Sequence, residues 1–559
     1  MDNYQIADSF SLLAKLTDIH GENSFKAKSY SIAAFTIEKL PMQLNETPPE
    51  KIFVIKGIGE STGKKILELL ETGELKALQE MIEKTPPGVM ELLNIKGLGP
   101  KKIATVWKEM EIESVGELLY ACQENRLKLY KGFGEKTQQN IIETIEFYFK
   151  SKGSFLFSQV DLLIEHVKSF FEKIFLTNKI AFTGHYTRQL EIINELQIVI
   201  DDTINNIENK LLTVPDFELI EKKQYELLYK ASIGLKIRLY SCDKTPMMQQ
   251  VFFNNCSNDF GDAFAKQFNS IDYSTCENEE AIFKKAALNF IPACLRESVS
   301  IIEKAKQGLL PPQLQVSDIK GIIHSHSNWS DGNYTIEEMA KSAIEKGFDY
   351  LVISDHSKSA FYANGLQENR IQEQHQYIDE LNKQFAPFKI FKSIESDILN
   401  DGSLDYSDAV LSTFDLVIAS IHSNLKMSED KAMMRLINAI ENPYTTILGH
   451  MTGRLLLSRK GYPVDHKKII DACAANNVVI ELNAHPSRLD VDWRHIDYAL
   501  EKNVLISIDP DAHSLDGFGD IRFGVSVAQK AMVRKENNLS SFGLKEIEAF
   551  LLKKKSKIK

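Results

Sequence analysis

Two histidines end a short apolar run, and an aspartate follows five residues after the second, in the stretch Gly321-Ile322-Ile323-His324-Ser325-His326-Ser327-Asn328-Trp329-Ser330-Asp331-Gly332. Helical patterns follow it, and one of them begins with a capping box at Thr335-Ile336-Glu337-Glu338. Seven strands that alternate with helices favour a parallel sheet closed into an α/β barrel. The other six apolar runs lie at residues 350–353, 390–392, 416–421, 445–448, 478–482 and 505–508.

Histidines and carboxylates come directly after these predicted strands. The C-terminal ends of parallel barrel strands meet on one face, so we expect the side chains to converge there. Neutral imidazoles and carboxylates are suitable ligands for zinc, manganese or iron. The alternative, that each is an ordinary core or surface residue, would have to hold separately for six histidines. The residues are His324, His326, Asp331, Asp355, His356, Glu395, His422, His450, Asp511 and His513.

The opening stretch and five later segments resemble, in order, the motifs of the PHP (polymerase and histidinol phosphatase) domain. The later segments are Ser354-Asp355-His356-Ser357, Ile394-Glu395-Ser396-Asp397, Ser420-Ile421-His422-Ser423, Gly449-His450-Met451-Thr452-Gly453-Arg454 and Asp511-Ala512-His513. The resemblance implies a (β/α)7-type barrel that hydrolyses phosphoesters with up to three divalent ions. It implies Mn²⁺ or Zn²⁺ as the expected metal, with Fe or Mg²⁺ as the alternatives. It also implies that Glu395 is a catalytic residue that bridges two of the ions. The ligands that it implies are His324, His326, Asp331, His356, Glu395, His422, His450, Asp511 and His513.

Three arginine and lysine side chains are candidates for contact with a substrate phosphate. Arg454 is the first, since a guanidinium binds phosphate bidentately, and its alternative is a surface ion pair. Arg488 and Lys358 are weaker candidates of the same type. Two positions depart from the family pattern: Ile322 stands where Asp is usual, and His485 where Asn is common. Neither is among the nine implied ligands.

The first 150 residues read as helical and repeat one short turn three times. The copies are Ile55-Lys56-Gly57-Ile58-Gly59, Ile95-Lys96-Gly97-Leu98-Gly99 and Tyr130-Lys131-Gly132-Phe133-Gly134, and lysines follow each copy. These turns resemble helix-hairpin-helix motifs, in which backbone amides and a helix N-terminus hold a DNA phosphate without reading sequence. The candidate DNA-binding residues are Gly57, Gly59, Gly97, Gly99, Lys101, Lys102, Gly132 and Gly134.

Hairpin motifs, a middle domain and a C-terminal PHP domain together resemble the bacterial family X DNA polymerases over essentially the whole chain. Residues 179–183, 196–200 and 233–240 are the predicted strands of the middle domain, which corresponds to a polymerase palm. An active palm needs three carboxylates, two of them in an Asp-x-Asp motif, to hold metal ions. Here the motif reads Glu195-Leu196-Gln197, and Lys236 stands at the third position. Lysine would repel the cation, so we expect a degenerate polymerase site.

A neighbouring pair, Asp201-Asp202, is the alternative metal site of the palm. Adjacent strand residues point to opposite faces, so this pair is poorly placed to share an ion. The expected fold is therefore multidomain, with an α-helical N-terminal region, an α+β palm remnant and an α/β barrel. The expected domains are residues 1–85 and 86–150 (hairpins), 151–312 (palm and thumb) and 318–559 (PHP).

Composition limits the remaining classes of function. Hydrophobic residues make up 43% and charged residues 26% of the 559, which is typical of a globular chain. The formal net charge of −11 excludes a protein that coats nucleic acid by bulk electrostatics. Six scattered cysteines exclude a disulfide framework and a cysteine zinc site. No run reaches the roughly 18 apolar residues of a membrane span, and no secretory signal opens the chain, so we expect a cytoplasmic protein without a membrane partner.

Four functions fit these observations. The first is a metal-dependent nuclease in DNA repair, most simply a 3′–5′ exonuclease, with abasic-site cleavage as a further activity. Its partner would be duplex DNA with gapped or recessed ends, bound independently of sequence. The others are an active polymerase with an attached exonuclease, a small-molecule phosphatase, and a non-catalytic DNA-binding scaffold.

Overall fold

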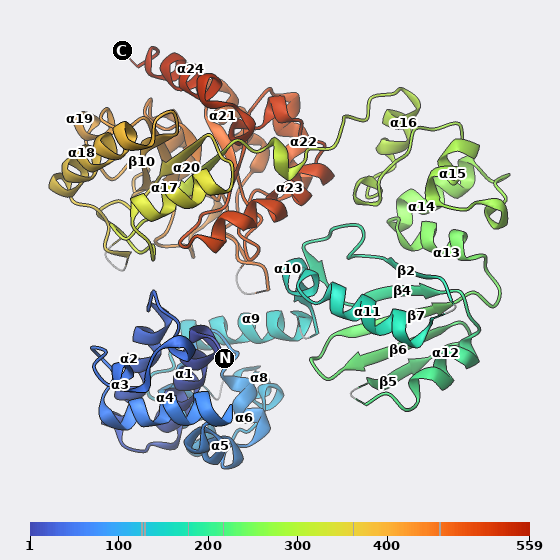
Figure 1. Ribbon diagram of the computed structural model, residues 1–559, viewed down its shortest axis with the longest axis horizontal. Helices are drawn as coiled ribbons and strands as arrows, with labels where there is room; N and C mark the ends of the chain where they lie inside the picture. Colours follow the sequence, from blue (N-terminus) through green and yellow to red (C-terminus); the bar gives the residue numbers. More distant parts are fainter. Residues whose placement is uncertain are drawn as a thin grey trace. The chain divides into compact units, whose positions relative to one another are not determined.

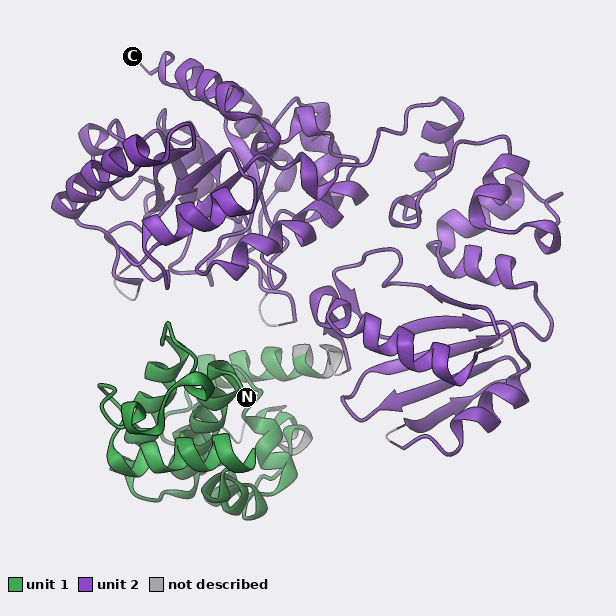
Figure 2. Ribbon diagram, viewed as in Figure 1, with its two compact units in different colours: residues 1–152 green, residues 153–559 purple. Residues whose placement is uncertain are grey.

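A computed structural model describes residues 1–123, 127, 130–151, 153–176, 178–215, 217–360, 363–457 and 460–558. The chain divides into two compact units, residues 1–152 and 153–559 (Figure 2). Among the described residues, none of the helices combines the length and the apolar character that a membrane span needs. The finer division into four domains remains a prediction.

The first unit is helical, as expected from its sequence. Helix α1 begins with a capping box at Asp2, and its C-terminal cap is Gly21 in the left-handed conformation. Its apolar face, including Phe10 and Leu16, packs in a single buried core with the other helices of the unit. The helices are α1 (Asn3–His20), α2 (Ser24–Glu38), α3 (Pro49–Ile52), α4 (Glu60–Thr72), α5 (Lys76–Glu83), α6 (Pro87–Leu92), α7 (Pro100–Lys108), α8 (Val115–Gln123) and α9 (Glu135–Ser151).

The second unit begins with a five-stranded mixed sheet in the order β2-β4-β7-β6-β5 (Figure 1). Its strands are β2 (Ile180–Thr183), β4 (Leu196–Ile200), β5 (Phe217–Lys222), β6 (Glu226–Ala231) and β7 (Lys236–Ser241), and β1 (Phe155–Leu156) pairs separately with β3 (Ile192–Ile193). The helices of this part are α10 (Phe157–Asp161), α11 (Ile164–Ile174), α12 (Ile204–Leu211), α13 (Met247–Asn254), α14 (Asn258–Gln267), α15 (Glu279–Lys285) and α16 (Ser300–Lys306).

The predicted strands 179–183 and 196–200 are present in this sheet, but the run 233–240 is only partly strand. Gly234 has a φ of 87° in the turn between β6 and β7, so β7 starts at Lys236. Sequence reasoning missed β5 and β6. Nearly all of β5 is exposed and carries Glu and Lys, so it lacks the apolar alternation that predicts a strand.

The rest of the second unit is the expected barrel of seven parallel strands. They are β8 (Gly321–Ser325), β9 (Tyr350–Ile353), β10 (Lys389–Asp397), β11 (Leu416–Ser420), β12 (Ile447–Leu448), β13 (Val479–Asn483) and β14 (Ile506–Asp509). An isolated bridge between Ser325 and Ala512 nearly closes the ring. The run 390–392 proves to be the first part of a longer strand, Lys389–Asp397, which places Glu395 inside β10 rather than after it. The capping box at Thr335 opens α17 as predicted.

Helices pack around the barrel, and one closes its end (Figure 1). The surrounding helices are α17 (Ile336–Glu345), α18 (Glu368–Phe385), α19 (Asp408–Leu411), α20 (Glu429–Glu441), α21 (His466–Asn476), α22 (Trp493–Glu501) and α23 (Ile521–Lys530). Helix α24 (Leu544–Lys555) buries Ile547 and Leu551 with the inner apolar side chains of the strands. Its Glu548 pairs with Lys389 at the start of β10. The opposite ends of the strands therefore remain for the polar residues.

A buried lysine joins the barrel to the palm-like part of the second unit. The Lys530 ammonium donates to the carbonyls of Arg188 at 2.8 Å and Cys294 at 3.2 Å, and lies 3.2 Å from Glu297. Glu297 also holds the Arg188 guanidinium through two hydrogen bonds of 2.9 Å. Three separate segments of the chain thus meet at one cation.

Candidate functional site

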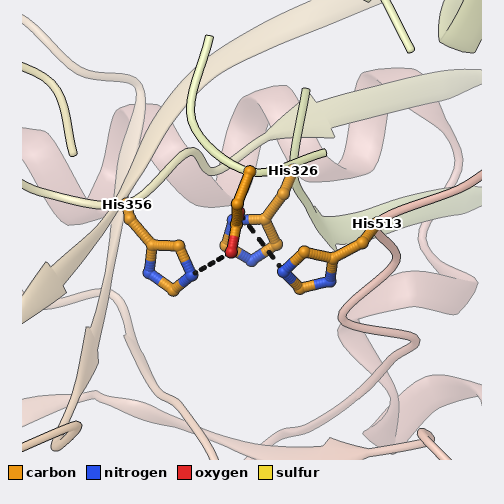
Figure 3. A group of neighbouring side chains, drawn as sticks. His326, His356 and His513 are labelled. Carbon is orange, nitrogen blue, oxygen red and sulfur yellow. Dashed lines mark ion pairs between the residues drawn. The ribbon is translucent and has the colours of Figure 1, made fainter. Parts of the chain in front are cut away.

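The structure brings the nine predicted ligands together at the C-terminal ends of the barrel strands. Ligand atoms of neighbouring residues lie within 4.8 Å of one another in three overlapping groups. Figure 3 shows the rings of His326, His356 and His513 turned toward one another. Asp331 lies 3.6 Å from His356 Nε2 and 3.4 Å from His513 Nε2. The groups are His326, Asp331, His356 and His513; His324, His326 and Asp511; and His356, Glu395 and His422.

Glu395 lies at the centre of this cluster, with histidines at both of its carboxylate oxygens. Because each oxygen faces different imidazoles, the side chain is placed as a bridging ligand requires. Oε1 is 3.0 Å from His450 Nε2, 3.1 Å from His422 Nε2 and 3.3 Å from His324 Nε2, whereas Oε2 is 3.0 Å from His356 Nδ1 and 3.7 Å from His326 Nε2.

The donor set of the cluster fits divalent cations. His324 Nε2, both ring nitrogens of His326 and Glu395 Oε2 are buried without a hydrogen-bond partner among the described residues. Buried polar atoms are nearly always partnered, so such a concentration of open acceptor positions indicates a cation site. Burial, followed by His513 and His356, lowers the pKa of His326 to about 3, which keeps the ring neutral. Burial would raise the pKa of the Glu395 carboxyl, but His422, His324 and His356 hold it well below its usual range.

Backbone geometry also marks the site. His324 has a φ of 60° and Asp511 a φ of 52°, in the left-handed region that residues other than glycine rarely adopt. Strain of this kind persists where the surrounding structure imposes it, and it concentrates at functional sites. Gly332 is required nearby, because a Cβ there would lie 2.0 Å from the carbonyl oxygen of His326.

Carboxylates behind the cluster hold its histidines, and sequence reasoning did not assign two of them, Asp397 and Glu481, to the site. Asp397 Oδ1 lies 2.7 Å from His422 Nδ1. Glu481 contacts His324 Nδ1 in the same way. The available signal was a charged residue inside the otherwise apolar run of β13. Asp355, adjacent to His356, accepts hydrogen bonds from residues of the loop after β8, which carries Asp331.

Arg454 does not point into the cluster. Its Nη1 lies 2.6 Å from Asp492 Oδ2, its Nε donates to the Arg488 carbonyl at 3.0 Å, and its Nη2 donates to the Leu489 carbonyl. All three nitrogens of the guanidinium therefore have protein partners, which corresponds to the ion-pair alternative. Arg488 lies closer, with Nε 3.6 Å from Asp511 Oδ2. The Lys358 ammonium is 2.7 Å from Glu368.

The palm positions contain an ion pair. Arg238 donates to both oxygens of Glu195, at 2.8 and 2.9 Å, and Gln197 donates to Glu195 at 2.8 Å. In the register of β4 and β7, Gln197 faces Arg238, and Lys236 starts the same strand. Asp202 accepts from Thr203 N and Asn206 Nδ2 and pairs with Lys210, so it serves the local structure.

The three repeated turns have the same backbone. Gly57, Gly97 and Gly132 have φ values of 96°, 89° and 91°. In each copy the amide after this glycine donates to the carbonyl three residues earlier. Gly59 and Gly99 are the N-caps of α4 and α7, and no described side chain caps either helix. The first-turn amides of both helices are therefore open to an anion.

Comparison with known proteins supports each part of this architecture. Residues 1–75 match a helix-hairpin-helix domain, residues 89–146 a SAM-like helix-hairpin-helix tandem, and residues 323–485 a PHP domain. The chain is 30% identical, over 96% of its own length and 97% of the relative's, to the DNA polymerase/3′-5′ exonuclease PolX of Bacillus subtilis (strain 168). A probable phosphatase of Thermoanaerobacter sp. (strain X514) is 27% identical over 42% of this chain and 95% of its own length.

Proposed function

This chain belongs to the family of the DNA polymerase/3′-5′ exonuclease PolX, and from that premise we propose that it is a metal-dependent nuclease that shortens DNA from 3′ ends and has no working polymerase site. A metal-dependent phosphoesterase is the activity common to the family and its PHP domain. The observation that carries the proposal is the buried Glu395 between two groups of histidines. Six imidazoles with three carboxylates suit Mn²⁺ or Zn²⁺, up to three ions.

The chain's own residues would bind the metal, the phosphate and the duplex. The nine ligands would hold divalent ions, which supply a water of lowered pKa and a Lewis acid for the scissile phosphate. Glu395 would be a ligand shared between ions, because its two oxygens face different imidazoles. Arg488, beside Asp511, would bind a non-bridging phosphate oxygen, and the hairpins would hold the backbone of the duplex.

The Glu195–Arg238 pair supports the loss of polymerase activity. A catalytic palm needs carboxylates free to bind cations, but here the one carboxylate of the motif is neutralised by two hydrogen bonds from a guanidinium. Gln197 has no charge, and Lys236 adds a positive one. A small-molecule phosphatase would not need the N-terminal region, which matches helix-hairpin-helix domains.

The experiment that tests the proposal is a gel time course on a 5′-labelled recessed primer–template with Mn²⁺. We expect the labelled strand to shorten one nucleotide at a time from its 3′ end, and EDTA to stop the reaction. A 3′-blocked primer and a primer with an internal abasic site separate exonuclease from endonuclease activity. Release of inorganic phosphate from small phosphoesters, without any cleavage of DNA, would favour the phosphatase.

Replacing Gly97 and Gly99 with Val should weaken DNA binding about tenfold, which corresponds to about 1.4 kcal/mol. The side chains would stand between the open amides of α7 and a phosphate, since both positions now face free space. Fluorescence anisotropy with a labelled duplex measures the change. Gly73→Val is the matched control, because Gly73 also has a positive φ of 76° and open surroundings but lies at the C-terminal end of α4, outside the three repeated turns. Equal affinity in both variants would remove the hairpins from the interface.

Arg488→Ala should lower kcat/KM for DNA cleavage about 100-fold, the effect of losing one donor to a developing charge. Arg454→Ala should have a smaller effect, because its guanidinium supports the 488–489 backbone rather than facing the cluster. Steady-state kinetics on the recessed primer compare the two variants. A larger loss in Arg454→Ala would restore Arg454 as the phosphate contact.

A further inference from the structure

Strand β13 differs from the other six barrel strands. None of the nine candidate ligands lies on it or in the loop after it, although its neighbours β12 and β14 are each followed by ligands. It nevertheless carries two polar residues, Glu481 and Asn483, which share one face and are both 0% exposed. A buried carboxylate is costly unless it is well paired. Their contacts therefore indicate what this strand does.

The two side chains of β13 contact three candidate ligands from three other parts of the barrel. Glu481 Oε1 lies against His324 Nδ1, and Glu481 Oε2 accepts from the backbone N–H of His450 at 2.5 Å. Asn483 Nδ2 donates to Asp511 Oδ2 at 3.1 Å and lies 3.3 Å from Glu481 Oε2. One strand thus connects residues of β8, the end of β12 and the end of β14.

We infer that β13 is the positioning strand of the metal centre, with Glu481 and Asn483 as positioning residues for His324, His450 and Asp511; the inference rests on the proposed function. A carboxylate at Nδ1 of His324 selects the tautomer that carries its proton there. The lone pair of Nε2 then points at Glu395 and the centre of the cluster, as metal binding requires. This contact also orients a residue whose backbone is in the left-handed region.

The influence of β13 on side chains is concentrated in one part of the cluster, since Glu481 meets His450 at the backbone amide but meets His324 at the ring. His324 and Asp511 are two of the three residues of one candidate group, with His326 as the third. The group of His356, Glu395 and His422 has a different support, since His422 is held by Asp397. Loss of the β13 contacts should therefore empty one metal position and leave the others occupied.

Glu481→Gln tests this with little change of shape. A carboxylate accepts from His324 and from the His450 amide at once, whereas a carboxamide has one acceptor oxygen and places an NH₂ group against the other donor. After reconstitution with Mn²⁺ and gel filtration, plasma emission spectroscopy should find about one ion fewer than in the wild type. Metal affinity at the changed position should fall about 10- to 100-fold, and excess Mn²⁺ should restore cleavage with KM for DNA unchanged.

Asp509→Asn is the matched control. Asp509 is equally buried, on β14 opposite Asn483, and among the described residues its side chain accepts a hydrogen bond from Ser507 rather than from a candidate ligand. We expect this variant to hold as many ions as the wild type and to melt in EDTA at the same temperature as Glu481→Gln. If Glu481→Gln is too unstable to purify, Asn483→Ala removes the contact to Asp511 and should weaken the same position.

The outcomes distinguish a failure of the proposed function from a failure of the role inferred for β13. A wild-type protein that binds no Mn²⁺ and cleaves no DNA contradicts the proposed function. A wild type that binds and cleaves, with Glu481→Gln or Asn483→Ala retaining every ion at wild-type affinity, overturns the role of β13 alone. Loss of all ions together in Glu481→Gln would also contradict it, because the effect would then not be confined to one position.

Discussion

Glu395→Ala should lower the rate of DNA cleavage about 1,000-fold or more, the scale seen when a residue that completes a catalytic unit is removed. Its two oxygens face five histidines, so its loss leaves ligands of different groups without a common bridging partner. The gel time course on the recessed primer measures the rate. Anisotropy with the same duplex should give a Kd within about twofold of the wild type, because the hairpins are unchanged.

The control for this variant is Glu429→Ala, which removes an exposed glutamate from the first turn of α20, outside the cluster. It should cleave at the wild-type rate. If Glu395→Ala also cleaved at that rate, the cluster would have no part in hydrolysis. A parallel loss of DNA affinity would instead show that the centre contributes to binding as well as to cleavage.

The second expected result is that the primer is not extended in a reaction that contains Mn²⁺ and all four deoxynucleotides. The reason is the palm's charge: Arg238 holds the Glu195 carboxylate, Gln197 contributes no negative charge, and Lys236 would repel a cation. The assay is best performed in Glu395→Ala, because loss of the nuclease prevents shortening from hiding slow synthesis. Extended products in this background would mean that the palm retains catalysis, with Asp201 as the available carboxylate.

Sequence reasoning found the barrel because its strands are buried on both faces and read as apolar runs, a pattern that is robust to small errors at strand ends. The hairpins were found because a turn with positive φ favours glycine, so the three repeated Gly-x-Gly segments can be recognised in the sequence. Strand β5 was missed because an exposed edge strand needs little apolar alternation, and β6 was missed because its buried residues, Leu227, Leu228 and Tyr229, are consecutive and do not alternate with polar ones. The role expected for Arg454 depended on which partner its guanidinium meets, and Asp492 lies 38 residues away in sequence.

Glu481 illustrates the same limit of sequence-based prediction within the candidate metal site. Its position in an apolar run was visible, but the two groups that it accepts from, His324 and the amide of His450, are 157 and 31 residues distant. Ligands at strand ends can be inferred from topology alone. Side chains that support them depend on which residues face each other across the barrel, and this requires the register of all seven strands.

The buried ammonium of Lys530 affects how cooperatively the second unit unfolds. Its ammonium is buried among groups supplied by the palm-like segment around Arg188 and by the segment around Cys294 and Glu297. Opening any one of these parts would strip acceptors from a buried charge, so the parts lose stability together. Residues 153–559 should then unfold in one calorimetric transition. A palm without catalysis would on this account persist because the nuclease folds against it.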